Sequence, residues 1–159
     1  MLDLGNKRVS MKSLLALSAL LLSASPAIAD DFLYLSCKQS VNLITTNLTT
    51  SKTIEDRTVD DVSILKIDFI KKTILDTRSA GPLSFTVQNN VMNVLTKSDD
   101  DELKINDVFK LNLFPPYSNS SRGTIVFKTK NKTNAHSANG FCKEVDGSVF
   151  EKALKESES

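Results

Sequence analysis

The chain has 159 residues, of which 40% are hydrophobic and 25% charged, with 20 basic and 19 acidic side chains. Its net charge of +1 lacks the basic excess of nucleic-acid-binding domains and gives no attraction to anionic membranes, so we expect neither partner. The length allows one ordinary hydrophobic core and not two.

The first residues have the pattern of a signal peptide. An apolar run from Leu14 to Ala24 is followed by Ala27-Ile28-Ala29, the small-x-small pattern of a cleavage site. We expect residues 1–29 to be removed and residues 30–159 to form one exported domain, in the bacterial periplasm or outside the cell. Met11 is an alternative start. The run is shorter than the roughly 20 residues that span a bilayer, so we expect no retained membrane anchor.

Apolar periodicity predicts the strands of the first half of the domain. They are Phe32 to Lys38, Val41 to Thr49, Val62 to Ile70 and Thr73 to Asp76. Ser51 to Asp61 carries charges without an apolar period, so we expect a loop there.

The middle of the chain predicts a hairpin followed by a long strand. Leu83 to Val87 and Val91 to Lys97 flank Asn89-Asn90, two residues that tolerate the left-handed backbone of a hairpin turn. The longest apolar alternation, from Glu102 to Phe114, predicts a strand with one face on the core and one in water. Because so long a strand is unusual, we expect a bend or tight turn near Asn106-Asp107.

The last part of the chain predicts two strands and a helix. Thr124 to Lys130 and Gly140 to Val145 read as strands joined by a polar loop from Asn131 to Asn139. Ser148 and Glu151 form a capping box, which predicts a short amphipathic helix capping one end of the sheet. The sequence therefore predicts an all-β antiparallel meander of about eight strands, closed or partly open as a small barrel, with a short C-terminal amphipathic helix.

Two cysteines, Cys37 and Cys142, lie in the first and last predicted strands. An even number of cysteines in an exported protein predicts a disulfide rather than free or metal-bound thiols. First and last strands become neighbours when a meander closes, so the predicted bond agrees with the predicted barrel.

No residue pattern indicates catalysis, a cofactor or a metal. His136, the sole histidine, falls in a predicted loop without an acid nearby in the sequence, so we expect it to be solvated. The run Asp99 to Glu102 lacks the alternating ligands and glycine of an EF-hand, which favours a solvated hairpin tip over a calcium site. We find no serine-nucleophile motif, and no carboxylate pair is marked by an apolar setting.

The segment Phe114, Pro115, Pro116 and Tyr117 is the candidate binding loop. The prolines end the preceding strand and hold two aromatic rings in a stiff tip, where little conformational entropy would be lost on binding. The alternative is an inter-strand loop that folds its own rings inward.

Tyr34-Leu35-Ser36-Cys37, together with the closing Cys142, resembles the small periplasmic barrels that inhibit c-type lysozymes. The resemblance implies a periplasmic enzyme inhibitor. The central Ser-Gly and Tyr loop motif of that family has no counterpart here, so no functional residue is carried over. We expect an exported, non-enzymatic binding or structural protein of the bacterial envelope, with an unknown small ligand or envelope protein as partner. The alternatives are the inhibitor and a carboxylate-dependent hydrolase.

Overall fold

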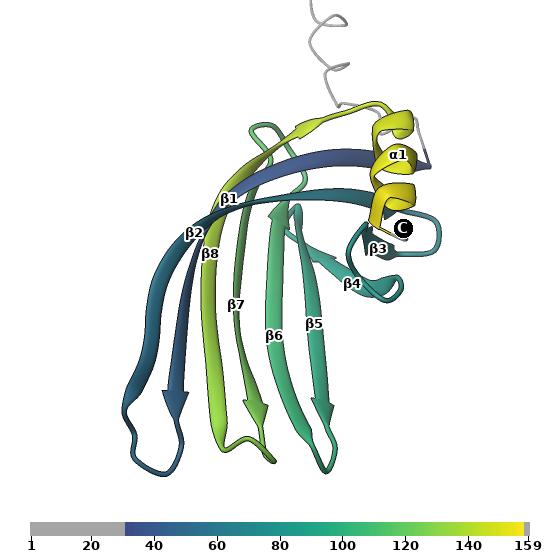
Figure 1. Cartoon of the computed structure of the whole chain (residues 1–159). Helices are drawn as coiled ribbons and strands as arrows, with labels where there is room; N and C mark the ends of the chain where they lie inside the picture. Colours follow the sequence, from purple (N-terminus) through teal and green to yellow (C-terminus); the bar gives the residue numbers. More distant parts are fainter. Residues whose placement is uncertain (1–30, 158–159) are drawn as a thin grey trace, which may run out of the picture.

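The computed structural model describes residues 31–157, which form a closed antiparallel barrel and one helix (Figure 1). The elements are β1 (Phe32–Asn47), β2 (Thr53–Asp68), β3 (Thr73–Asp76), β4 (Leu83–Gln88), β5 (Val91–Asp99), β6 (Leu103–Asn112), β7 (Ser118–Phe127), β8 (Lys132–Glu144) and α1 (Gly147–Ser157). Each strand pairs with its neighbours in sequence, and β1 also pairs with β8. The predicted barrel and helix are confirmed, while the predicted signal peptide lies outside the described residues.

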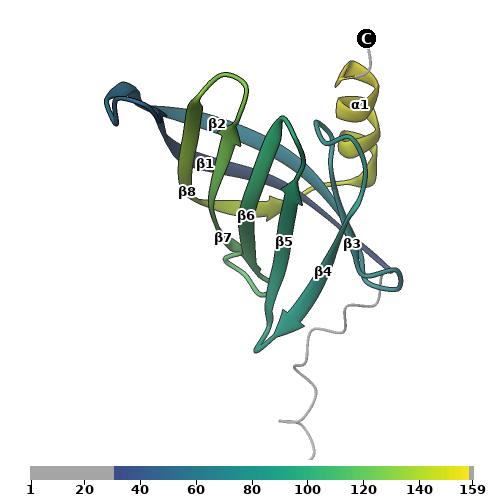
Figure 2. The ribbon, with the colours of Figure 1, turned by 90° about the horizontal axis from the view of Figure 1, so that it is seen from below.

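The strands close the barrel over only part of its height. The four-residue β3 pairs with β2 through Leu65–Asp68, and β4 meets β5 through Val91–Val94. In the described chain, Thr53–Ser63 of β2 and Leu95–Asp99 of β5 pair on one side only. The two strands accordingly lie at opposite sides of the lower sheet in Figure 1, and Figure 2 shows β3 and β4 bridging them at one end. The barrel is thus closed at one end and open at the other.

The hydrophobic core fills the closed end. Inward positions alternate with outward ones along each strand, as expected of a sheet with one buried face. The buried cluster comprises Leu35, Cys37, Leu65, Ile67, Ile74, Phe85, Met92, Val94, Leu111, Tyr117 and Cys142. Cys37 and Cys142 face each other in the β1–β8 register with their sulfur atoms 2.00 Å apart, so the predicted cysteine pair is confirmed at disulfide distance.

The helix packs on the outer surface of β1 and β2. Phe150 is buried there with its ring centroid 5.9 Å from that of Tyr34, and the ammonium group of Lys66 lies 6.0 Å from the Phe150 centroid. The predicted capping box is wrong, since Asp146 caps the helix two residues earlier: its Oδ1 accepts a hydrogen bond of 2.9 Å from the Ser148 amide. Capping by Asp146 explains why the helix already includes Ser148.

Two of the predicted loops are wrong, because both segments are strand. Ser51 to Asp61 lies mostly in β2 and Asn131 to Asn139 mostly in β8. Over these stretches burial does not alternate between core and surface, so no apolar period marks them. Continuous backbone pairing with β1 holds both of them in the sheet.

Three strand boundaries also differ from the prediction. The two strands expected between Phe32 and Thr49 are one, because Gln39 and Ser40 pair with both β2 and β8. The turn expected at Asn106-Asp107 is wrong, since both residues pair with β5 and β7. The strand expected from Thr124 begins at Ser118. By contrast, Asn89 and Asn90 form the predicted hairpin turn, with φ of 50° and 62°.

Candidate functional site

A cavity of about 180 Å³ opens where β3 and β4 stop bridging the sheet. Its apolar wall continues the core, and its polar side chains come from five different strands and from the β3–β4 connection. It is lined by Gln39, Ser63, Leu65, Ile74, Asp76, Ser79, Leu83, Val94, Asp107, Phe109 and Ser121. Such a mixture of an apolar wall with a few polar groups is typical of a small-molecule site.

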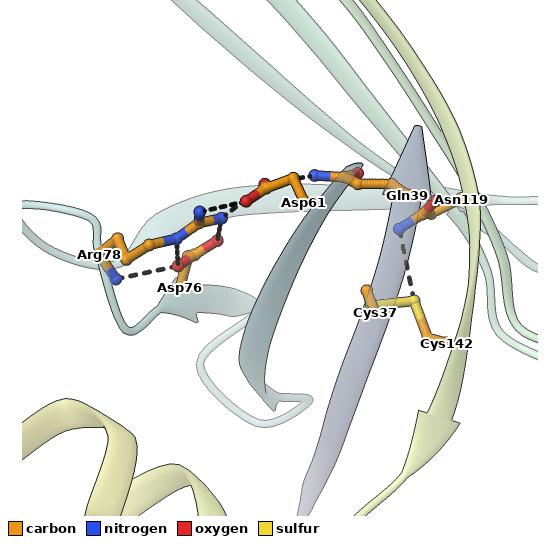
Figure 3. Close-up of a disulfide and its surroundings, with 7 residues drawn as sticks. All are labelled: Cys37, Gln39, Asp61, Asp76, Arg78, Asn119 and Cys142. Carbon is orange, nitrogen blue, oxygen red and sulfur yellow. Dashed lines mark hydrogen bonds and ion pairs between the residues drawn. A yellow bond between two sulfur atoms is a disulfide. The ribbon is translucent and has the colours of Figure 1, made fainter. Parts of the chain in front are cut away.

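One rim of the cavity is held by Arg78, which follows β3 (Figure 3). Its guanidinium donates to both carboxylate oxygens of Asp61 on β2, at 2.8 and 3.1 Å. It also reaches the Asp76 carboxylate, from Nε at 3.3 Å. Gln39 donates to Asp61 Oδ2 at 3.1 Å from β1. Arg78 therefore ties the β3–β4 connection to a part of β2 that pairs with β1 but has no strand on its other side.

This arrangement favours the ionised form of Asp61. The bidentate hydrogen bonds from Arg78 hold the pKa of Asp61 below its usual value, and the same bonds raise the pKa of Arg78. A carboxylic acid that protonates a leaving group needs the opposite shift, a raised pKa. Asp61 and Asp76 thus converge on a cation rather than forming an acid and base pair.

The inner wall of the open end carries an acid and a histidine side by side. Asp107 of β6 and His136 of β8 each pair with Gly123 of β7, which lies between them. A Cβ atom at Gly123 would lie 2.7 Å from His136 Cε1 and 2.8 Å from Asp107 Oδ1. Because glycine has no side chain, the two residues approach each other across the strand, with His136 Nε2 3.4 Å from Asp107 Oδ1.

His136 and Asp107 differ in their hydrogen bonding. The carboxylate of Asp107 raises the pKa of His136, mainly through their hydrogen-bonding contact and against the effect of partial burial. Asp107 Oδ1 is itself buried, and it accepts no well-formed hydrogen bond from the described residues. Asp107 lines the cavity, so this oxygen is an acceptor available to a hydrogen-bond donor in or beside it.

No family model, curated protein or solved structure matches this chain.

The resemblance to lysozyme inhibitors therefore gains no support from these comparisons. Within residues 31–157, no helix is long and apolar enough to cross a membrane.

The predicted binding loop divides between surface and core. Tyr117 is only 8% exposed and belongs to the core cluster, and its hydroxyl donates to Glu144. Burial, followed by that contact, raises the pKa of Tyr117 to about 12. Phe114 is 37% exposed, and Pro115 and Pro116 are exposed beside it. The loop lies away from the cavity lining, and whether it binds a partner stays a prediction.

The other candidates from the sequence have structural partners. Asp99 binds Lys128 at 2.6 Å and Lys104 at 3.3 Å, while Asp100 accepts the amide of Leu103 within its own turn. Among the described residues, no group of three or more acids, histidines or cysteines is placed to hold a metal. Beside the cysteine pair, Asn119 donates to Cys142 Sγ at 3.4 Å.

Sequence reasoning missed the polar groups of the cavity. One signal was available: Asp107 occupies an inward position between Ile105 and Phe109 in the apolar alternation of β6. Nothing comparable marks Arg78 or His136, because their partners lie on other strands. Their roles follow from strand register and not from local sequence.

Proposed function

We propose that this protein is an exported, non-enzymatic binding protein of the bacterial envelope, and that the cavity at the open end of the barrel receives its ligand. The observation that carries the proposal is Asp107 Oδ1, a buried acceptor without a well-formed hydrogen bond on the wall of a concave, partly apolar cavity. Leaving a buried acceptor without a good hydrogen bond costs about 1 to 3 kcal/mol, and a ligand donor would offset part of this cost at Asp107 Oδ1, which has only the 3.4 Å contact with His136.

The cavity volume limits the ligand. Pockets for drug-sized ligands have volumes of about 300 to 1,000 Å³, so a cavity of about 180 Å³ suits a smaller molecule or one end of a longer one. A hydroxyl, amide or amine would donate to Asp107, while an apolar part would contact Leu65, Val94 and Phe109. The rim carboxylates give less support to a hydrolase, since both Asp61 and Asp76 form ion pairs with Arg78.

Export is supported by the cysteine pair, because disulfides persist in oxidising compartments. N-terminal sequencing of the protein from its host's periplasm or medium should find a chain that begins at Asp30. A chain that began at or before Ser25 would contradict the proposed processing.

Native mass spectrometry of the protein purified from its own organism tests the binding function. We expect a bound mass on the wild-type protein, and its loss from Ser121→Phe, which places a ring in the cavity lining. Thr86→Phe adds the same ring at an exposed position of β4 and serves as the matched control. A wild-type protein without bound mass, or a mass equally retained by Ser121→Phe, would contradict the proposal.

A further inference from the structure

The outer face of β6, β7 and β8 carries only positive charge. At the positions that point away from the core, these three strands carry Lys104, Lys110, Arg122 and Lys143, and no acid among the described residues. The remaining outward positions are largely serine, threonine and asparagine. The whole chain holds almost equal numbers of acids and bases, so this face differs clearly from the average surface. The side-by-side arrangement of the three strands is visible in Figure 1.

This face is also hollowed. Two adjoining depressions of about 590 and 440 Å³ share Lys110, Ser120 and Asn139 in their walls. Arg122 and Ser137 line the first depression, and Phe141 bounds the second. We call the two together the outer groove. It lies on the opposite side of the sheet from the cavity, so it is a separate site.

Several polar side chains of the outer groove form no hydrogen bond or ion pair with described residues, although Asn112 and Asn119, in the wall of the second depression, do. Lys104, at its edge, binds Asp99 at 3.3 Å, whereas Lys110 and Arg122 form no ion pair in the described part of the chain. The side chains of Ser120, Ser137 and Asn139 likewise make no hydrogen bond to described residues. These cations and neutral donors are therefore available to an external ligand.

An aromatic ring stands at one end of the groove. Phe141 is 63% exposed although it lies near the end of a strand that is paired on both sides. It offers a flat apolar surface directly beside hydroxyl and amide groups. Cations, neutral hydrogen-bonding groups and one stacking ring match a polymer that has negative charges, hydroxyl groups and flat apolar ring faces.

We propose that the outer groove binds an anionic polysaccharide that carries carboxylates. Lys110 and Arg122 bind the carboxylates, Arg122 through a charge-assisted fork. Ser120, Ser137 and Asn139 exchange hydrogen bonds with sugar hydroxyls, and Phe141 stacks on a ring face. Nucleic acid fits less well, because the chain has no overall basic excess and the groove offers one aromatic ring for base stacking.

Titration of the full mature protein with oligogalacturonate, followed by calorimetry, tests the proposal. We expect binding that weakens with added salt, and no binding of an uncharged maltooligosaccharide of the same length. Lys110→Gln and Arg122→Gln should each weaken binding about tenfold. Lys155→Gln removes one exposed charge from α1, which packs on β1 and β2 away from the groove, and should leave binding unchanged.

Phe141→Ala should weaken binding without lowering the melting temperature, because the ring is exposed. Ile70→Ala, at an exposed position in the turn between β2 and β3, is its control. Absence of oligogalacturonate binding, equal binding of the uncharged sugar, or indifference to the groove variants would overturn the proposal. Tighter binding of a DNA oligonucleotide of equal charge would also overturn it, since the groove would then be a general polyanion surface.

Discussion

Replacing Gly123 by alanine tests whether a missing side chain is what brings Asp107 and His136 together. The added Cβ would lie 2.7 Å from His136 Cε1 and 2.8 and 2.9 Å from Asp107 Oδ1 and Cγ. Both neighbours are side-chain atoms that can rotate, whereas the backbone of β7 is fixed by pairing on both sides. We therefore expect the acid and the histidine to separate while the strand stays in place.

Two effects should follow, one on stability and one on titration. Crowding of this kind costs about 1 to 3 kcal/mol, which corresponds to a fall in melting temperature of about 3 to 10 °C for a domain of this size. Separation from Asp107 should also lower the pKa of His136 towards the ordinary value of 6.5, since that contact is the largest cause of its rise. Asp107→Asn should produce the same change in pKa without the crowding.

The sign of the pH dependence is fixed by the raised pKa. The wild-type pair contributes stability that is fully present below pH 6.5, the unfolded value, and is lost as pH rises through the higher pKa of the folded state. The two variants should lack this loss of stability above pH 6.5. The difference between wild type and variant should therefore be largest in acid and shrink towards alkaline pH.

Nuclear magnetic resonance offers a direct assay, because the chain has a single histidine whose ring signals need no assignment. Gly81→Ala is the matched control, as a Cβ there meets no atom within 4 Å. An unchanged His136 pKa in Gly123→Ala, or an equal loss of stability in Gly81→Ala, would refute the reasoning.

Three further predictions concern the fold. Cys37 and Cys142 are 105 residues apart in the sequence, so reduction of their bond should destabilise the domain by up to about 4 to 5 kcal/mol. Thiol labelling of both cysteines without reductant would show that the bond is absent. Tyr117→Ala should lower the free energy of unfolding by about 3 to 5 kcal/mol, because it leaves a cavity in the core, whereas Phe114→Ala should change the thermal melt little. Equal losses of stability in the two variants would contradict the division of this loop into core and surface. Asp146→Ala should lower the melting temperature at neutral pH. The difference in melting temperature between wild type and variant should vanish as pH falls through the depressed pKa of Asp146. A difference that persists in strong acid would argue against the capping role of Asp146.

Apolar alternation was sufficient to predict the strands that border the core. Val62 to Asp68, Thr73 to Asp76 and the long β6 have one buried face, and that face imposes a period of two. The cysteines in the first and last strands indicated closure. The sequence did not predict that Thr53–Asp61 and Lys132–Asn139 are strand. Both segments are held in the sheet by backbone pairing, which does not require an apolar face.

The candidate site was harder to predict than the fold. Its polar groups meet through register: Asp107 and His136 are opposite the same glycine although 29 residues separate them. Arg78 meets Asp61 because the short β3 places the following turn beside a part of β2 that is paired only with β1. Only the inward position of Asp107 within an apolar alternation could have indicated a polar site inside the barrel.

A crystal structure of the protein purified from its own organism tests the proposed function most directly. We expect ligand density in the cavity, with a donor atom within hydrogen-bonding distance of Asp107 Oδ1 and an apolar part against Phe109. A well-ordered structure in which that cavity holds only water, or in which Asp107 Oδ1 accepts a good hydrogen bond from the protein itself, would contradict it.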